Sequence, residues 1–276
     1  MRRFAFLDLD GIVNHKTWLR AIADGHEQRP TVRMADRDQA VLINPAKVEL
    51  LNMLVRPGIE WVLSSTWRGD GSDRARTHVQ SVLEQLGWRG QLIGSTPVLR
   101  TVPKMVSAHG FQLGQPTRGV EIMVWLESNG FRREQLGKDV RVAILDDDDD
   151  IEPLKEHWVA VDDTSGLTEE NVLCGLSLLG EVVIVVVELL PRPQSRLRCF
   201  KAGSCHLMAN GYNEAHLDAL HKFAARIGMH RSYFQPHKIA PHYDLTKGRR
   251  EAAVEAGALE IPARSFLGEL RRLRSS

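Results

Sequence analysis

The chain has 276 residues, 43% of them hydrophobic and 26% charged, values that are ordinary for a soluble globular protein of one large or two smaller domains. The three cysteines follow no disulfide pattern, no signal peptide is predicted, and the longest apolar run, at 182–190, is too short to span a bilayer. We therefore expect a cytoplasmic protein in a reducing compartment, with no membrane partner. The net charge of +1 hides an asymmetry, because residues 1–180 carry 21 Lys and Arg against 26 Asp and Glu (net −5), while residues 181–276 carry 15 against 9 (net +6). An acidic half followed by a basic half indicates two functional units.

Strand-like and helix-like stretches alternate over the first 180 residues. Strands are predicted at 4–7, 59–65, 91–95 and 140–145, and helices at 44–55, 73–87, 119–130 and 167–180. Asn44 followed by Pro45 is a typical helix start, Gly87 a typical helix end, and Thr168 a candidate cap. Residues 15–43 form a polar stretch that we interpret as irregular. This alternation predicts an α/β fold with a Rossmann-like parallel sheet and helices on both faces.

A second, smaller unit is predicted over residues 181–276, so that the first domain covers 1–180. The segment PRPQSR at 191–196 separates the two, although the apolar run before it fits the second unit as its first strand. A helix is predicted at 213–228, with Asn213 or Glu214 at its start. Another helix follows Thr246 and ends at Gly257, and Ser265 is a candidate cap of a short last helix. The predicted class of this unit is α+β.

Polar side chains follow three of the predicted strands of the first domain. They are Asp8 and Asp10 after the first strand, Ser64 and Ser65 at the end of the second, and Asp146 and Asp147 after a later one. Turn chemistry explains Asp10, which precedes a glycine, but not Asp8, because an unpaired carboxylate at the end of a buried strand is costly. Ligands of parallel sheets bind at the carboxyl ends of the strands. We therefore predict that Asp8 shares a metal ion, and the phosphate held by that ion, with the later aspartates.

Four segments resemble, in order, the four motifs of the haloacid dehalogenase-like (HAD) hydrolase superfamily. They are FLDLDGIVN at 6–14, VLSSTWR at 62–68, RGVEIMVWL at 118–126 and VAILDDDDDI at 142–151. The resemblance is closest to the branch of small phosphatase domains found in RNA-repair fusions, and the segment DDTSGLTEE at 162–170 is also similar to that branch. It extends over residues 3–180 and implies a HAD-like phosphatase.

The residue types in these motifs suit the activity that the resemblance implies. Asp8 would attack phosphorus and form an aspartyl-phosphate, while Asp10 would protonate the leaving oxygen and then activate water. Asp10 favours phosphate-ester chemistry, because ATPases of the superfamily carry Thr at that position and dehalogenases lack the Asp. Ser65 would donate a hydrogen bond to the phosphoryl group. Ser64 is the alternative donor, because the register of SSTW is ambiguous.

Arg118 and the aspartate run complete the predicted site. Arg118 lies in the first turn of its predicted helix, where a cation opposes the helix dipole, and a bound anion would offset that cost. The expected cofactor is Mg²⁺, which prefers carboxylate ligands. Its predicted ligands are Asp8, Asp10, Asp146 and Asp147. Asp150 is an alternative to Asp147. Taken alone, the first motif would be explained by an Asp-x-Asp-Gly turn, and the aspartate run by a solvated acidic loop.

Residues outside the four catalytic positions are predicted to contact the substrate or to cover the site. Arg68 is predicted to bind substrate phosphate, with a surface salt bridge as the alternative. Only residues 15–43 and the loop at 95–117 could form a specificity cap. A weakly capped, open site would admit a nucleotide, a nucleic-acid end or a protein.

The second unit resembles a small bacterial and phage domain family of unknown function, over residues 181–262. The similar segments are CHLMANG, LHKFAARIGM, SYFQ, HYDLT and AVEAGALEI. His206 and His242 fall on these motifs and are predicted to help bind a phosphate or nucleotide. Zinc is the alternative, although no spacing matches a known ligand pattern, and His221 lies on the apolar face of its helix, as a core histidine would.

The sequence therefore predicts a Mg²⁺-dependent phosphatase that hydrolyses a phosphomonoester, with a nucleotide or nucleic-acid end as the favoured substrate. The alternative is a nucleic-acid-binding or partner-binding protein, in which the second unit is the functional part and the HAD-like domain a scaffold. The oligomeric state is left open.

Overall fold

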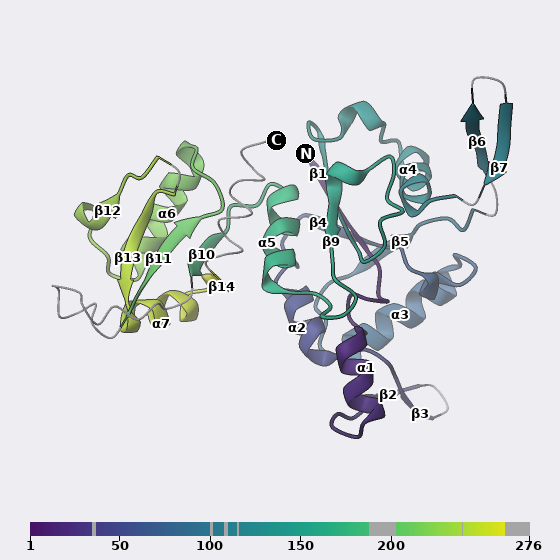
Figure 1. Ribbon diagram of the computed structural model, residues 1–276, viewed down its shortest axis with the longest axis horizontal. Helices are drawn as coiled ribbons and strands as arrows, with labels where there is room; N and C mark the ends of the chain where they lie inside the picture. Colours follow the sequence, from purple (N-terminus) through teal and green to yellow (C-terminus); the bar gives the residue numbers. More distant parts are fainter. Residues whose placement is uncertain are drawn as a thin grey trace. The chain divides into compact units, whose positions relative to one another are not determined.

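The computed structural model describes residues 1–34, 37–99, 102–107, 110–114, 116–187, 203–238 and 240–262. The chain divides into two compact units, Met1–Leu179 and Gly180–Ser276, each of which is described by itself (Figure 1). The predicted linker at 191–196 and the predicted cap Ser265 lie outside the described residues.

Five parallel strands form the sheet of the N-terminal unit, in the order β5-β4-β1-β8-β9. They are β1 (Arg2–Leu7), β4 (Ile59–Leu63), β5 (Leu92–Ser95), β8 (Val140–Asp146) and β9 (Trp158–Ala160). Leu7 at the end of β1 pairs with Leu63 of β4 and Leu145 of β8, so the carboxyl ends of these three strands lie side by side. The predicted Rossmann-like α/β fold is confirmed, and β9 is a strand that the sequence pattern missed.

Four helices of this unit lie at the predicted segments, and two of them begin directly after their predicted caps, Asn44 and Thr168. They are α2 (Pro45–Asn52), α3 (Asp73–Gln85), α4 (Arg118–Ser128) and α5 (Glu169–Leu178). The Asn44 side chain accepts from the Ala46 N–H, and the Thr168 hydroxyl accepts from the Asn171 N–H. Such caps satisfy N–H groups that have no partner within the helix. Within the part of the chain that the structure describes, no helix is both long and apolar enough to cross a membrane.

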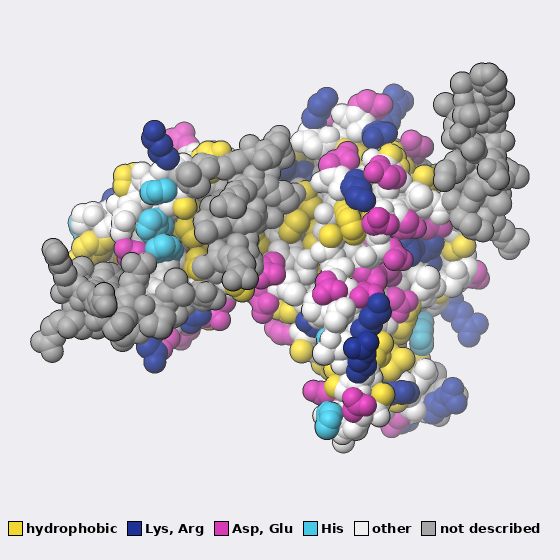
Figure 2. Space-filling model, viewed as in Figure 1, with side chains coloured by type: hydrophobic (Ala, Val, Ile, Leu, Met, Phe, Trp, Pro, Cys, Tyr) yellow, Lys and Arg dark blue, Asp and Glu magenta, His cyan; other side chains and the backbone are white. Residues whose placement is uncertain are grey.

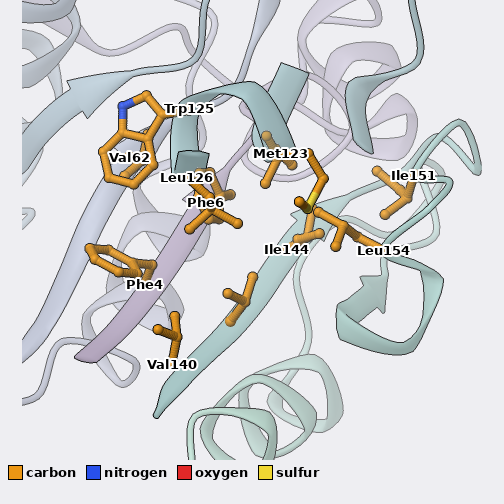
Figure 3. Close-up of a cluster of buried hydrophobic side chains, with 12 residues drawn as sticks. Phe4, Phe6, Val62, Met123, Trp125, Leu126, Val140, Ile144, Ile151 and Leu154 are labelled. Atoms are coloured by element: carbon orange, nitrogen blue, oxygen red, sulfur yellow. The ribbon is translucent and has the colours of Figure 1, made fainter. Parts of the chain in front are cut away.

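Helix α4 covers one face of the sheet through a cluster of buried apolar side chains (Figure 3). Trp125 lies edge-on to Phe4 and Phe6, with ring centroids 5.4 and 5.5 Å apart. Burying a large apolar side chain contributes about 1.5–3 kcal/mol, so these contacts hold β1 firmly against α4. This packing fixes the end of β1 relative to the start of α4, which is where the polar residues of the two motifs lie.

Two excursions from the sheet contain more regular structure than the sequence predicted. The prediction that residues 15–43 are irregular is wrong for α1 (Lys16–Ala23) and for the hairpin of β2 (Thr31–Arg33) and β3 (Asp38–Ala40). Helix α1 is only eight residues long, and Trp18 is its one buried side chain. A second hairpin is formed by the antiparallel pair of β6 (Val102–Ser107) and β7 (Gly110–Gly114) (Figure 1).

The C-terminal unit is a small α+β fold, as predicted. Its mixed sheet has the order β12-β13-β11-β10-β14, in which the β10–β14 pair is parallel and the other pairs are antiparallel. The strands are β10 (Ile184–Val187), β11 (Ser204–Ala209), β12 (Phe234–Gln235), β13 (His242–Thr246) and β14 (Leu259–Ile261), and the helices are α6 (Glu214–Arg226) and α7 (Lys247–Glu255). Because β10 pairs with β11 and β14, the apolar run near residue 185 supplies a strand of this unit.

Candidate active site

Three carboxylates meet at the carboxyl edge of the N-terminal sheet. Asp8, Asp146 and Asp147 bring carboxylate oxygens within 4.8 Å of one another. Asp8 is 5% exposed and Asp146 is 1% exposed, so two of the three groups are almost fully removed from water. Strand order explains the cluster, because Asp8 follows β1 and the other two lie at the end of β8, the neighbouring strand.

The electrostatics of the cluster favour the addition of positive charge. Burial, and secondarily the charge of Asp8, raises the pKa of Asp146 to about 8. Burial also raises the pKa of Asp147 to about 6. The Oδ1 atom of Asp146 accepts from the Asp148 N–H at 3.0 Å, but Oδ2 has no hydrogen-bond partner. An oxygen-only donor set with a buried, unsatisfied carboxylate oxygen fits a hard divalent cation such as Mg²⁺.

Gly11 allows the backbone after β1 to approach this cluster. Its φ angle is +69°, and a Cβ atom built there would lie 2.2 Å from the Cγ atom of Asp147. Any side chain at this position would therefore displace Asp147 as well as strain the backbone.

Arg118 is the cation that faces the carboxylates. Its Nε atom lies 3.4 Å from Asp146 Oδ2, and its Nη2 atom lies 4.0 Å from Asp8 Oδ2. Burial raises the pKa of Asp8, whereas the Ser65 hydroxyl and Arg118 oppose that rise. The Arg118 backbone N–H donates to Asp150 Oδ2 at 3.2 Å, so Asp150 binds the start of α4 and is not part of the acidic cluster of the described residues.

The two serines of the second motif point to different neighbours. The Ser65 hydroxyl is hydrogen-bonded to Asp8, whereas the Ser64 hydroxyl accepts from the Thr96 hydroxyl at 3.4 Å. Consecutive side chains at the end of a strand point to opposite sides, so one of the two can reach the nucleophile candidate. The geometry brings Ser65, and not Ser64, to Asp8.

Asp10 stands apart from the three clustered carboxylates. Its Oδ1 atom accepts from Asn14 Nδ2 at 2.6 Å and from Trp67 Nε1 at 3.0 Å, and its Oδ2 atom accepts from the Thr66 hydroxyl at 2.9 Å. Our sequence reasoning missed these three donors, although each lies within a quoted motif. The predicted set of four metal-binding carboxylates is thus arranged as a group of three and a separately held Asp10.

Arg68 is a member of a buried ion pair that the sequence did not reveal. Its Nη2 atom lies 2.5 Å from Glu121 Oε2, and its Nη1 atom donates to the Ser65 carbonyl oxygen at 2.8 Å. Arg68 is 5% exposed and Glu121 is 7% exposed, so this is not the surface salt bridge that we considered as the alternative. Both side chains border a pocket of about 320 Å³ that Arg118 and Asp150 also line.

His206 and His242, the other predicted substrate contacts, lie in the C-terminal unit beside Asp244. The Nε2 atom of His206 is 3.4 Å from Asp244 Oδ1. A carboxylate in this position opposes direct binding of a phosphate, because like charges repel.

The parallel sheet and the residues at its carboxyl edge define a Rossmann-like α/β domain with a cluster of three carboxylates at that edge. More specifically, the chain belongs to the family described as "HAD domain in Swiss Army Knife RNA repair proteins", whose model matches residues 4–172. A second model, described as "Protein of unknown function (DUF4031)", matches residues 195–273. No curated protein and no solved structure gave a significant match. Both predicted resemblances are confirmed, and membership of a HAD family indicates a hydrolase of the phosphatase type.

Proposed function

We propose that the N-terminal unit is a Mg²⁺-dependent phosphatase that hydrolyses phosphomonoesters through an aspartyl-phosphate on Asp8. The observation that carries this proposal is the meeting of Asp8 with Asp146 and Asp147 opposite Arg118. Phosphoryl transfer requires a positioned nucleophile and positive charge around the equatorial oxygens, and this group of side chains can supply both once a cation is bound.

The proposed metal ligands are the clustered carboxylates Asp8, Asp146 and Asp147. When bound, Mg²⁺ would neutralise these groups and polarise a phosphoryl oxygen. Arg118 would hold a second phosphoryl oxygen, and the Ser65 hydroxyl a third. The Arg68–Glu121 pair would act on the substrate indirectly, since Arg68 holds the Ser65 carbonyl and borders the pocket beside Arg118.

In the first proposed step, an Asp8 carboxylate oxygen attacks phosphorus as the bond from phosphorus to the leaving oxygen breaks. Asp10, protonated at that moment, donates its proton to the leaving oxygen. In the second step, the Asp10 carboxylate takes a proton from water, and the water oxygen attacks phosphorus. The bond between phosphorus and Asp8 then breaks, which releases inorganic phosphate and regenerates both aspartates.

Asp10 is suited to this exchange of a proton because its position does not depend on the metal ligands. Asn14, Thr66 and Trp67 orient its carboxylate through three hydrogen bonds. A side chain that is fixed by its neighbours can face the leaving oxygen in one step and the water in the next.

The Asp10→Asn variant is expected to separate the two steps. With p-nitrophenyl phosphate, whose leaving group requires no proton, it should give a burst of about one p-nitrophenolate per active site and then a steady state slower by roughly 10²–10⁴-fold. With phenyl phosphate, a poorer leaving group, the burst should disappear. Rapid-mixing absorbance measures both, and equal losses for the two esters without a burst would contradict the acid–base role of Asp10. The Mg²⁺ concentration for half-maximal activity of the same variant tests its predicted role as a ligand.

We propose a phosphorylated nucleic-acid end as the substrate. Three observations support it: the RNA-repair description of the family, the pocket beside Arg118, and the net charge of +6 over residues 181–276. Cationic surfaces recruit polyanions and lose this advantage as salt increases.

A panel of phosphate esters tests the substrate proposal. The kcat/KM value for a short 5′- or 3′-phosphorylated oligonucleotide should exceed that for a sugar phosphate by about 10-fold or more at low salt, and the difference should shrink between about 50 and 200 mM salt. Activity on p-nitrophenyl phosphate should vary little over that range. A preference for sugar phosphates at every salt concentration would contradict a nucleic-acid substrate while leaving the phosphatase proposal intact.

A further inference from the structure

We propose that the C-terminal unit holds a second metal site, in which His206, His242 and Asp244 bind a first-row divalent transition-metal ion such as Zn²⁺. One ligand atom from each of these residues lies within 4.8 Å of the other two. Histidine side chains gather on the viewed face of this unit (Figure 2). The proposal is independent of the phosphatase reaction, because it concerns a different unit of the chain.

Strand register brings these three residues together. His206 on β11 pairs directly with Asp244 on the antiparallel strand β13, and His242 lies two residues before Asp244 on the same strand. Side chains two residues apart on a strand share a face, so all three are on one side of the sheet. The alternate residues of β13, Tyr243 and Leu245, are buried in the core on the other side.

The distances match the ligands of one ion better than they match direct hydrogen bonds. Asp244 Oδ1 lies 3.4 Å from His206 Nε2 and 3.8 Å from His242 Nε2. Hydrogen bonds between such atoms are normally about 2.7–3.2 Å long. Two ligands at about 2.0–2.1 Å from a tetrahedral zinc ion are about 3.4 Å apart. Both distances from the Asp244 oxygen to a histidine nitrogen are therefore already near the spacing that coordination requires.

The ring of His242 presents its Nε2 atom to Asp244. Its Nδ1 atom lies 2.7 Å from the Ala240 carbonyl oxygen, which can only accept, so Nδ1 carries a hydrogen. Nε2, on the other side of the ring, is then the nitrogen that can bind a metal ion, and it lies 3.8 Å from Asp244 Oδ1.

Neighbouring groups hold the ligands as they do in known metal sites. Gln235 Nε2 donates to Asp244 Oδ2 at 2.6 Å, which leaves Oδ1 directed at both histidines. The Ala240 carbonyl fixes the ring of His242 in the same way. Metal-binding histidines and carboxylates almost always have such outer hydrogen bonds, which orient them and set their basicity.

The donor set selects the class of metal. Two imidazole nitrogens and one carboxylate oxygen suit Zn²⁺ and its neighbours in the first transition row, whereas Mg²⁺ and Ca²⁺ favour oxygen ligands. Three protein ligands leave a coordination position open for water or for an oxygen of an anionic ligand. Through such an ion, the two histidines could contribute to phosphate binding even though Asp244 lies between them.

Cobalt binding to the full-length, metal-free protein tests the site. The Asp146→Asn variant serves as the parent, because it weakens binding at the acidic cluster of the N-terminal unit. Titration with Co²⁺ should give one tight site with visible d–d absorption, and Zn²⁺ should displace the cobalt. Adding Asp244→Asn or His206→Gln should weaken Co²⁺ binding by about 100-fold or more, and Gln235→Ala by about 10-fold.

His230→Gln is the matched control, since His230 is an exposed histidine of the same unit that lies outside the cluster, and it should leave cobalt affinity unchanged. Circular dichroism and thermal melts verify that each variant is folded. If a ligand variant fails to fold, Gln235→Ala decides, because unchanged affinity in that variant would overturn the proposal. Equal affinity in the parent and the folded ligand variants would also overturn it. A third result would overturn the proposal: inorganic phosphate that binds to the parent in the presence of EDTA and no longer binds to the ligand variants.

Discussion

Replacing Asp8 with asparagine is expected to abolish phosphate release while leaving the fold intact. The substitution removes the attacking charge at nearly constant volume, and loss of a covalent nucleophile lowers kcat by roughly 10⁴-fold or more. The Leu9 N–H donates to Asp8 Oδ1 at 2.7 Å, a bond that the asparagine oxygen can still accept. Because Asp8 is buried beside Asp146, removing its charge should not lower the melting temperature of the metal-free protein.

Steady-state release of inorganic phosphate measures this effect, and Asp149→Asn is its matched control. Asp149 lies in the same acidic run, is exposed, and forms a long contact of 3.9 Å with Lys155, so its variant should keep nearly full activity. Reduction of the wild-type intermediate with borohydride should mark residue 8 in a mass spectrum. Turnover of the Asp8→Asn protein at more than a few per cent of the wild-type rate would rule out the covalent mechanism.

Removal of divalent metal is expected to have a comparably large effect. EDTA should reduce phosphatase activity to background, and Mg²⁺ should restore it, because the clustered carboxylates repel an incoming phosphate unless a cation neutralises them. The donor set consists of oxygens alone, which favours Mg²⁺ over softer metals. Recovery with Zn²⁺ alone would show that the assignment to a hard cation is wrong.

The same cluster predicts how the stability of the metal-free protein depends on pH. The folded-state pKa values of Asp146 and Asp147, about 8 and about 6, lie above the ordinary value of 3.8. The folded state therefore binds more protons than the unfolded state, and stability should fall as pH rises from about 4 to about 8. Saturating Mg²⁺ should raise the melting temperature most at the upper end of this range. There the carboxylates have lost their protons, and Mg²⁺ neutralises the repulsion between their charges.

Thermal melts with and without Mg²⁺ measure this dependence. A change of 1 kcal/mol moves the melting temperature of a domain of this size by about 2–4 °C, so the difference is readily observed. Asp146→Asn should remove most of the Mg²⁺-induced rise without destabilising the metal-free protein. A rise of equal size in this variant would indicate that Mg²⁺ stabilises the protein elsewhere.

Much of the fold could be predicted from the sequence, because it depends on local signals. Apolar runs of strand length, helix caps such as Asn44 and Thr168, and polar residues at strand ends all act over a few neighbouring residues. Parallel strands bring their carboxyl ends to one edge, so the proximity of Asp8 and Asp146 follows from the alternation of strands and helices. The region 15–43 was misread because its elements are short: α1 has eight residues, of which only Trp18 is buried, and β2 and β3 have three residues each.

The finer arrangement of the candidate active site depended on contacts between distant segments. Whether Ser64 or Ser65 reaches Asp8 depends on the side to which each serine points after β4, which a run of two identical residues does not encode. The ion pair of Arg68 with Glu121 joins residues 53 positions apart. Glu121 lies in a segment that otherwise reads as an apolar helix, so nothing local indicates its partner.

The sequence by itself determined which chemical groups end the strands of the N-terminal sheet, and so the class of reaction that they can support. Only the tertiary structure decided which of those groups meet. It separated Asp10 from the carboxylate cluster, and in the C-terminal unit it brought His206 opposite Asp244. The physical reason is that strand ends and caps arise from local backbone energetics, whereas side-chain constellations arise from strand register and helix packing. Register is set by burial over the whole sheet, and a slip of one residue would turn each of these side chains to the other face.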